Sequence, residues 1–188
     1  MLNEIVLKKF VEKQLVGIPL IGLSQINRLQ SLSEKISSEL EFDAMILNTS
    51  IMLHNIGVRQ WMDFNNNVVL GSVAISKRFL SDNFFPHKKI SGVVHCIEQC
   101  HVKGIPLSIE AKILHDSFLL DEMGAIGVLK DSFVFVKQKK PFSSWISSAK
   151  QKLSLVKNGF SLENARELSI PRIEFYENYY KALENETI

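Results

Sequence analysis

Two histidine-containing segments of the sequence combine residue types that bind metal ions or move protons. His54 and Asn55 end the apolar run SIMLHNIG, and Asp116 follows His115 in ILHDSFLLDEMGAIG. Adjacent helical residues point about 100° apart, so His54 and Asn55 can share a metal ion only near a helix end. A buried Asp116 needs a partner or a metal, because an unpaired carboxylate is unfavourable in a core. Taken singly, each segment also fits a structural role: a buried histidine bonded to a carbonyl, or an aspartate that caps the next helix.

A third segment, HCIEQCH, holds His95, Cys96, Cys100 and His101. The two cysteines share one face of a helix, but four ligands cannot converge on one ion from a single straight helix. Zinc sites usually draw on two separated ligand pairs. We therefore predict two buried thiols rather than a zinc site.

Composition excludes several classes of protein. The 188 residues are 46% hydrophobic and 22% charged, with a net charge of +2, which is typical of a soluble globular protein without a strong nucleic-acid signal. Two cysteines four residues apart argue against a disulfide framework, and no apolar run is long enough for a membrane span or signal peptide. The basic clusters at 87–89 and 137–140 are expected to be solvated loops, and no phosphate-binding glycine loop is present. We expect a cytoplasmic protein.

Apolar spacing predicts helices along almost the whole chain, with irregular structure at 58–70 because of three consecutive asparagines. Asp43, Ser108 and Ser161 are predicted helix caps. The fold class is therefore all-α: a compact helical bundle forming one domain over 1–188, with its core at about 20–135 and C-terminal helices at 143–186 packed on it. The predicted helices cover approximately 2–15, 23–40, 43–57, 72–83, 87–101, 107–116, 120–136, 145–156 and 162–186.

Taken in order, five motifs resemble the HD-domain superfamily of metal-dependent phosphohydrolases, and its stand-alone bacterial branch in particular. The motifs are QINRL, LHNI, CHV, EAKILHDSFLLDEMGAIG and the C-terminal ENARELSIPRIEFYENYYKALENE. The resemblance extends from about Leu23 to Glu186. It implies an HD-type helical fold and a metal held by a histidine, a His-Asp pair and a final aspartate.

The metal motif that the resemblance implies is degenerate in this chain. His54 and Asp116 match the second and fourth ligands, whereas Gln25 and Asn55 stand at the positions of the other two. Phe118 and Leu119 replace an aspartate and an arginine of the long motif. The cleft that the resemblance implies also contains Arg28, His101, His115 and Asp121.

These replacements lead to two hypotheses about function. Neutral amides are weak ligands for hard divalent metals, so we expect no cofactor and a catalytically silent domain, a pseudoenzyme that binds a nucleotide, another phosphate-bearing ligand or a protein partner. The alternative is an active phosphohydrolase on nucleotides or phosphate esters that uses Mn, Mg, Fe or Zn. In that case His54 and Asp116 remain ligands, and His101 or His115 is recruited to replace the lost ones.

Overall fold

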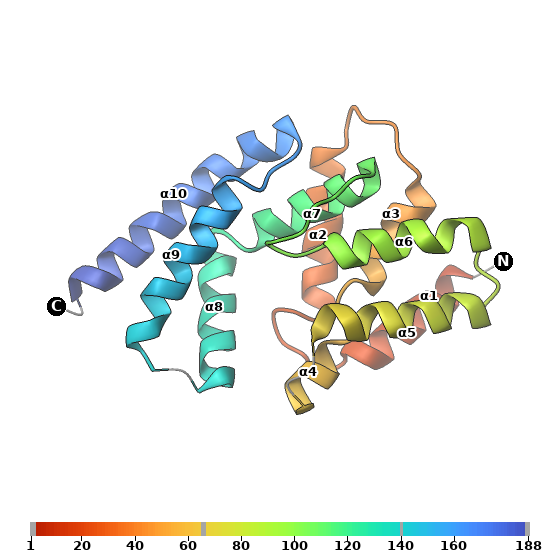
Figure 1. The fold of residues 1–188 in the computed structure, drawn as a ribbon, viewed down its shortest axis with the longest axis horizontal. Coiled ribbons are helices and arrows are strands. Elements are labelled where there is room, and N and C mark those ends of the chain that lie inside the picture. The colour runs from red at the N-terminus through yellow and green to blue at the C-terminus, as the bar shows by residue number, and fades with distance from the viewer. Residues whose placement is uncertain (1–2, 65–66, 140, 187–188) are drawn as a thin grey trace.

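The computed structural model describes residues 3–64, 67–139 and 141–186, and every regular element among them is an α-helix (Figure 1). This confirms the predicted all-α fold class. The helices are α1 (Glu4–Leu15), α2 (Leu23–Ile36), α3 (Ala44–Leu53), α4 (Val58–Phe64), α5 (Val68–Asp82), α6 (His87–Gln99), α7 (Ile109–Asp121), α8 (Gly124–Gln138), α9 (Ser143–Lys157) and α10 (Glu163–Glu186). No helix in the described ranges is long and apolar enough to cross a membrane.

Two of the predicted helix caps form as expected. The Asp43 side chain accepts hydrogen bonds from the amides of Met45 and Ile46 at the start of α3. The Ser108 hydroxyl accepts one from the Ala111 amide at the start of α7. Each bond satisfies an amide that has no partner within its own helix, so each helix begins where its cap lies.

Helix α7 is the centre of the fold. It packs against α2, α3 and α6 on one side and against α8 and α10 on the other. Consistent with this position, Ile113, Leu114, Asp116, Leu119 and Asp121 are all almost completely buried, although they point in different directions around the helix. A helix surrounded in this way places each of its polar groups against a different neighbour.

The last three helices lie beyond α7, on the side away from α1 and α5 (Figure 1). Gly124 begins α8 with φ +69, a left-handed conformation that permits the sharp turn out of α7. A Cβ at Gly127 would lie 2.2 Å from the Glu122 carbonyl oxygen and 3.5 Å from the Tyr176 ring. Only glycine therefore allows α8 to pack this closely against the α7–α8 turn and α10.

The prediction of irregular structure at 58–70 is wrong. Val58, Trp61 and Met62 have helical spacing and pack on or in the core as part of α4. Asn67 caps α5 by accepting a hydrogen bond from the Leu70 amide, so it starts a helix instead of lengthening a loop. Residues 65–66 lie outside the described residues.

Other predicted boundaries shift by a few residues. Helix α5 begins at Val68 instead of Ser72, and α6 ends at Gln99, two residues before His101. The basic segment at 137–140 is not a free connection, because α8 continues through Lys137 to Gln138. Residue 140 lies outside the described part of the chain.

Candidate functional site

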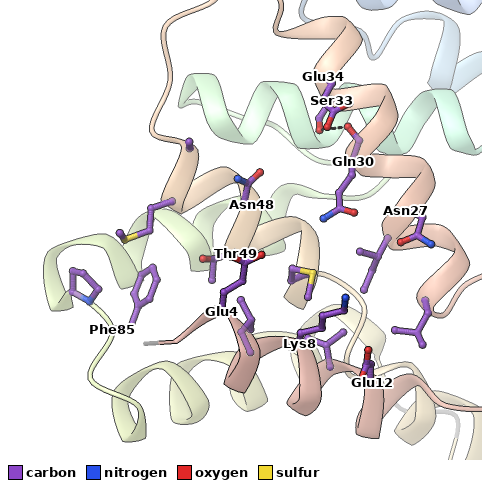
Figure 2. A pocket seen from close by; sticks show the side chains of 18 residues that line it. Glu4, Lys8, Glu12, Asn27, Gln30, Ser33, Glu34, Asn48, Thr49 and Phe85 are labelled. Carbon is purple, nitrogen blue, oxygen red and sulfur yellow. Dashed lines mark hydrogen bonds between the residues drawn. The ribbon is translucent and has the colours of Figure 1, made fainter. Parts of the chain in front are cut away.

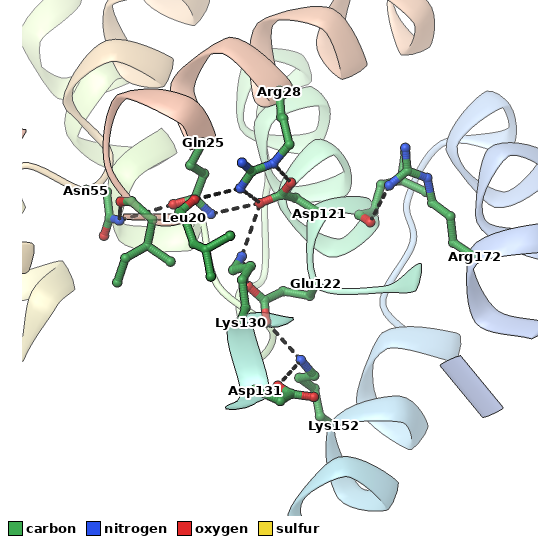
Figure 3. A network of polar contacts seen from close by, with 12 residues as sticks. Leu20, Gln25, Arg28, Asn55, Asp121, Glu122, Lys130, Asp131, Lys152 and Arg172 are labelled. Atoms are coloured by element: carbon green, nitrogen blue, oxygen red, sulfur yellow. Dashed lines mark hydrogen bonds and ion pairs between the residues drawn. The ribbon is translucent and has the colours of Figure 1, made fainter. Parts of the chain in front are cut away.

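Two amide side chains meet a carboxylate between α2, α7 and the end of α3 (Figure 3). The Asn55 Nδ2 group donates to the Ile21 carbonyl oxygen at 2.5 Å and to the Gln25 Oε1 atom at 3.1 Å. The Gln25 Nε2 group in turn donates to Asp121 Oδ2 at 3.1 Å. Gln25 and Asp121 are both 1% exposed. The hydrogen bonds therefore run in one line from Asn55 through Gln25 to Asp121.

Two cations bind the same carboxylate. Arg28 donates to Asp121 Oδ1 from Nε at 2.5 Å and to Oδ2 from a terminal nitrogen at 3.1 Å, a bidentate contact. The Lys130 ammonium of α8 donates to Asp121 Oδ2 at 3.1 Å. With the Gln25 amide, three donors from two helices therefore converge on one buried carboxylate.

The polar network continues from Lys130 toward α10. Lys130 also forms an ion pair with Glu122, and Glu122 accepts a hydrogen bond from Lys152 at 3.1 Å. Lys152 reaches Asp131, which also accepts hydrogen bonds from the hydroxyls of two α10 tyrosines, Tyr176 and Tyr180. The network therefore links α2, α7, α8, α9 and α10 through alternating positive and negative groups.

The charges in this network hold one another ionised. Burial alone would lower the pKa of Lys130, but the carboxylates of Glu122 and Asp121 outweigh it and raise the pKa above its ordinary value. Burial likewise opposes ionisation of Asp121, yet Lys130 and Arg28 hold its pKa below the usual range. Glu122 has a lowered pKa because Lys130 and Lys152 overcome its burial.

His54 lies at the C-terminal end of α3 and is 5% exposed. Its Nδ1 atom is 2.7 Å from the Ile51 carbonyl oxygen, so Nδ1 carries the proton and Nε2 keeps a lone pair. That Nε2 atom is buried without a hydrogen-bond partner. Burial lowers the pKa of His54 to about 4, and Lys130 and Asp121 lie near enough to act on it with smaller, opposite effects. His54 is therefore neutral at physiological pH.

Asp116 takes a different part in the structure from Asp121. Its two oxygens accept hydrogen bonds from the backbone amides of Ser161 and Leu162, at 2.8 to 3.1 Å, immediately before α10. Asp116 and Asp121 are five residues apart, so they point about 140° from each other around α7. The sequence left open that Asp116 caps the helix directly after it, whereas in the structure Asp116 lies within α7 and binds the amides that precede α10. It is Asp121 that accepts a hydrogen bond from Gln25.

The remaining cleft residues form a separate group around Asp116. The His115 Nδ1 atom is 3.2 Å from Asp116 Oδ1, and its Nε2 atom is buried without a partner. His101 has a pKa lowered by burial and by nearby His115.

The two cysteines are buried free thiols, as predicted. Burial raises the pKa of Cys96 to about 11 and that of Cys100 well above its usual range.

The residues at this site do not fit the divalent metal that the motifs imply. His54 Nε2 has a free lone pair, as a metal-binding imidazole would. However, the Gln25 amide oxygen accepts from Asn55, and Asp121 is engaged by a lysine, an arginine and an amide. Within the described ranges, no three histidine, cysteine, aspartate or glutamate side chains are grouped so that they could hold a metal ion.

Sequence reasoning missed Lys130 and Glu122 as members of the site. Lys130 directly follows the apolar stretch AIGVL, and it is only 4% exposed. A charge at that position in an apolar helix face was the available signal, because a buried lysine needs a carboxylate partner.

Solved structures of other proteins have a fold similar to that of this chain. No protein-family model matches the sequence, and no curated protein shows significant similarity to it. The Lin1889 protein of Listeria innocua matches with a TM-score of 0.74 and 19% identity over 97% of this chain and 94% of that one. Bacillus subtilis YpgQ in complex with ADP matches with 0.72 and 21% identity over 98% and 97%. A predicted HD superfamily hydrolase from an uncultured Thermotogales bacterium matches with 0.67 and 17% identity over 98% and 93%. The chain therefore has the helical fold of the HD superfamily of hydrolases.

Proposed function

We propose that this protein is a catalytically silent HD-fold domain that acts by binding. The observation that carries the proposal is the hydrogen bonding of Gln25 and Asn55, whose amides bond to each other and to Asp121 and Ile21. A metal-bound water has a pKa near 7, whereas free water has one of about 15.7, so hydrolysis of phosphate esters needs a cation bound by strong ligands. Here the Gln25 oxygen already accepts from Asn55 and the Asp116 oxygens accept from the Ser161 and Leu162 amides, while the His54 Nε2 lone pair stays free.

The centre is also unsuited to a phosphate-bearing ligand. Its cations Arg28, Lys130 and Lys152 are matched by Asp121, Glu122 and Asp131, three positive charges against three negative ones. Each of these three cations is paired with a carboxylate, and Arg172, the other cation shown in Figure 3, donates a hydrogen bond to the Leu120 carbonyl oxygen. Buried Leu119 and partly buried Phe118 replace the polar residues of the long motif with apolar surface. These features favour a protein partner over a nucleotide.

A hollow lies elsewhere, between α1, α2, α3 and the α5–α6 turn (Figure 2). It has a volume of about 780 Å³. On α2, Ile26 and Gln30 line this groove, whereas Gln25 and Arg28 reach Asp121. At about 100° per residue, the two pairs lie on different sides of α2. The groove is therefore separate from the polar network.

The lining of the groove indicates the partner that suits it. Its floor includes apolar Leu7, Val11 and Met52, while carboxylates dominate its charged lining. These carboxylates are Glu4, Glu12 and Glu34, against a single cation, Lys8. An acidic, partly apolar groove repels polyphosphates and suits an amphipathic helix with basic side chains. We propose such a helix of a protein partner as the ligand.

Two measurements on the purified protein test this function. Phosphatase turnover is measured on nucleotides and simple phosphate esters with added Mn, Mg, Fe or Zn, for the native protein and for His54→Ala. We expect no turnover that depends on His54. A metal bound in stoichiometric amount, with turnover abolished by His54→Ala, would overturn the proposal.

Binding is tested with a synthetic lysine- and leucine-containing amphipathic helical peptide, and separately with ADP. The peptide should bind saturably, and Glu4→Lys combined with Glu12→Lys should weaken it about tenfold or more, since charge reversal costs at least about 1.4 kcal/mol. Glu174→Lys, on the exposed surface of α10, is the matched control. Saturable ADP binding without peptide binding would replace the protein partner with a nucleotide.

A second function, an active phosphohydrolase with a rebuilt site, is favoured by one observation. The buried, unpaired Nε2 atom of His54 has the protonation pattern of a metal-binding imidazole. For Asp116 to act as a second ligand, it would have to release the amides of Ser161 and Leu162. If Asp116→Asn leaves a metal-dependent turnover unchanged, that mechanism is wrong.

A further inference from the structure

Helix α8 turns an apolar face toward solvent, where a surface helix normally carries polar side chains. Leu129 is 51% exposed and Val136 is 79% exposed. They are seven residues apart, so they point within about 20° of each other around the helix. Exposed Ala125 and half-buried Phe133 lie about 40° to either side of Leu129, so these four side chains form one stripe along α8.

Two lysines lie at the C-terminal end of this stripe. Lys137 is in the last turn of α8, and Lys139 follows the helix as its C-cap residue. Both are exposed, and within the described ranges neither forms an ion pair. The stripe and the two lysines are called the α8 face below. This face is that of an amphipathic helix with a basic end.

The groove between α1, α2 and α3 has the complementary chemistry (Figure 2). Its carboxylates Glu4, Glu12 and Glu34 are exposed, and in the described parts of the chain none of them forms an ion pair. Apolar Leu7 and Met52 line the same groove. The α8 face therefore offers the positive charge and the apolar contact that the groove would accept.

Charge distinguishes α8 from the other C-terminal helix with an apolar surface. Helix α10 exposes Phe175 at 47% and Tyr179 at 37%. However, α10 carries six glutamates against two arginines and one lysine, so an acidic groove would repel it. The groove therefore favours α8 over α10.

The α8 face and the groove lie on different parts of the molecule (Figure 1). Helix α8 packs on α7 and α10, whereas α1, α2 and α3 form the groove. We propose that the α8 face of a second copy of this chain binds in the groove, so that the protein associates head to tail. This inference rests on the proposed function, whose partner helix it identifies. Because two different surfaces meet, the contact is heterologous and generates either a closed ring or an open chain.

The experiment measures the average mass of the full-length protein by sedimentation equilibrium, over about 1 to 300 µM, a range that covers weak interfaces. The mass of the native protein should rise above that of the monomer as the concentration increases. Leu129→Asp combined with Val136→Asp should remain monomeric throughout. The matched control is Ile170→Asp, which alters a side chain that is 65% exposed on α10 and should associate like the native protein.

Charge exchange tests whether the groove is the surface that α8 meets. Glu4→Lys combined with Glu12→Lys should raise the Kd of self-association about tenfold or more, and so should Lys137→Glu combined with Lys139→Glu. All four substitutions in one chain should bring the Kd back toward the native value, because the charges have then exchanged surfaces. These side chains are exposed, so each variant should melt like the native protein.

Three results would overturn the inference: a native protein that stays monomeric over the whole range, association that survives reversal of the groove charges, or failure of the fourfold variant to recover. Loss of association in the α8 variant alone would indicate that two α8 faces pair with each other. The outcome for the proposed function is separate. A monomeric protein that binds the basic peptide would leave that function standing, whereas phosphatase turnover that depends on His54 would overturn it without affecting the α8 contact.

Discussion

Lys130 of α8 donates a hydrogen bond of 3.1 Å to Asp121, the last residue of α7, where both side chains are almost completely buried. The same carboxylate accepts from Arg28 and Gln25 of α2. One carboxylate therefore joins three helices through hydrogen-bond donors on its oxygens. This relationship explains how contacts among its own side chains can hold the centre of an HD-type fold together.

Removing the charge of Asp121 should be strongly destabilising. Asp121→Asn leaves Lys130 without one of its two carboxylates and weakens the bidentate contact with Arg28. Breaking a buried ion pair costs about 3–5 kcal/mol of unfolding free energy. Urea unfolding of this variant measures that loss. The control is Asp82→Asn, because the Arg78–Asp82 pair is largely exposed and should matter little; equal effects at the two positions would contradict the central role of Asp121.

Restoring the metal aspartate at Asn55 should harm the protein. The Asn55 amide donates to Ile21 and Gln25, and a carboxylate at that position would face both oxygens without a proton to share. We expect Asn55→Asp to lower the unfolding free energy by about 2 kcal/mol, with no recovery in manganese. Asn48→Asp, at an exposed position of α3, is the matched control and should change stability by less than about 0.5 kcal/mol. If manganese restored the stability of Asn55→Asp, the residues around position 55 would still be able to bind a metal ion.

Asp116 should act on α10 and not on metal binding. Asp116→Ala removes the acceptors for the Ser161 and Leu162 amides, so the start of α10 should exchange its amide hydrogens faster. The unfolding free energy should fall by about 2 kcal/mol, since hydrogen bonds to a charged group are lost. Asn67→Ala at the start of α5 gives the effect of an ordinary helix cap for comparison. Protection of α10 that is unchanged in Asp116→Ala would refute this role.

Stability should fall in mild acid because of His54. Its pKa is about 4 in the folded protein against 6.5 for an ordinary histidine, so between these values the unfolded chain binds more protons. Its contribution is therefore complete above pH 6.5 and is lost as the pH falls toward 4, by up to about 3 kcal/mol. The half-buried His101 has a pKa shifted in the same direction and adds to the slope.

The measurement is the unfolding free energy of native protein and His54→Gln from pH 4.5 to 7. The variant should show a much flatter dependence over this range, whereas His87→Gln, at the exposed start of α6, should keep the native slope. An identical slope in His54→Gln would show that this buried imidazole is not the group responsible. The lowered pKa values of Asp121 and Glu122 act at lower pH, outside most of this window.

Much of the fold can be predicted from local patterns in the sequence. Apolar residues at helical spacing predict most of the helices, and Asp43 and Ser108 mark where α3 and α7 begin. Helix α4 was missed because the run of asparagines outweighed the spacing of Val58, Trp61 and Met62. Asn67 is a helix cap. An asparagine favours a cap when helix-forming residues come directly after it, and it favours a loop when they do not.

The candidate site was harder to predict because motif position does not determine which way a side chain points. The motif assigns the fourth ligand to Asp116, yet the orientation of α7 brings Asp121 to Gln25 and turns Asp116 to α10. Lys130 reaches the site only through the packing of α8 on α7. Neither fact can be obtained from spacing along the chain, since both depend on the relative placement of helices.

The most direct test of the account is diffraction from a crystal of the native protein soaked in manganese, recorded with anomalous scattering. We expect the Lys130 nitrogen within hydrogen-bond distance of Asp121, with no anomalous peak beside that carboxylate. A strong peak bridging Asp121 and His54, with Lys130 displaced from both, would contradict it.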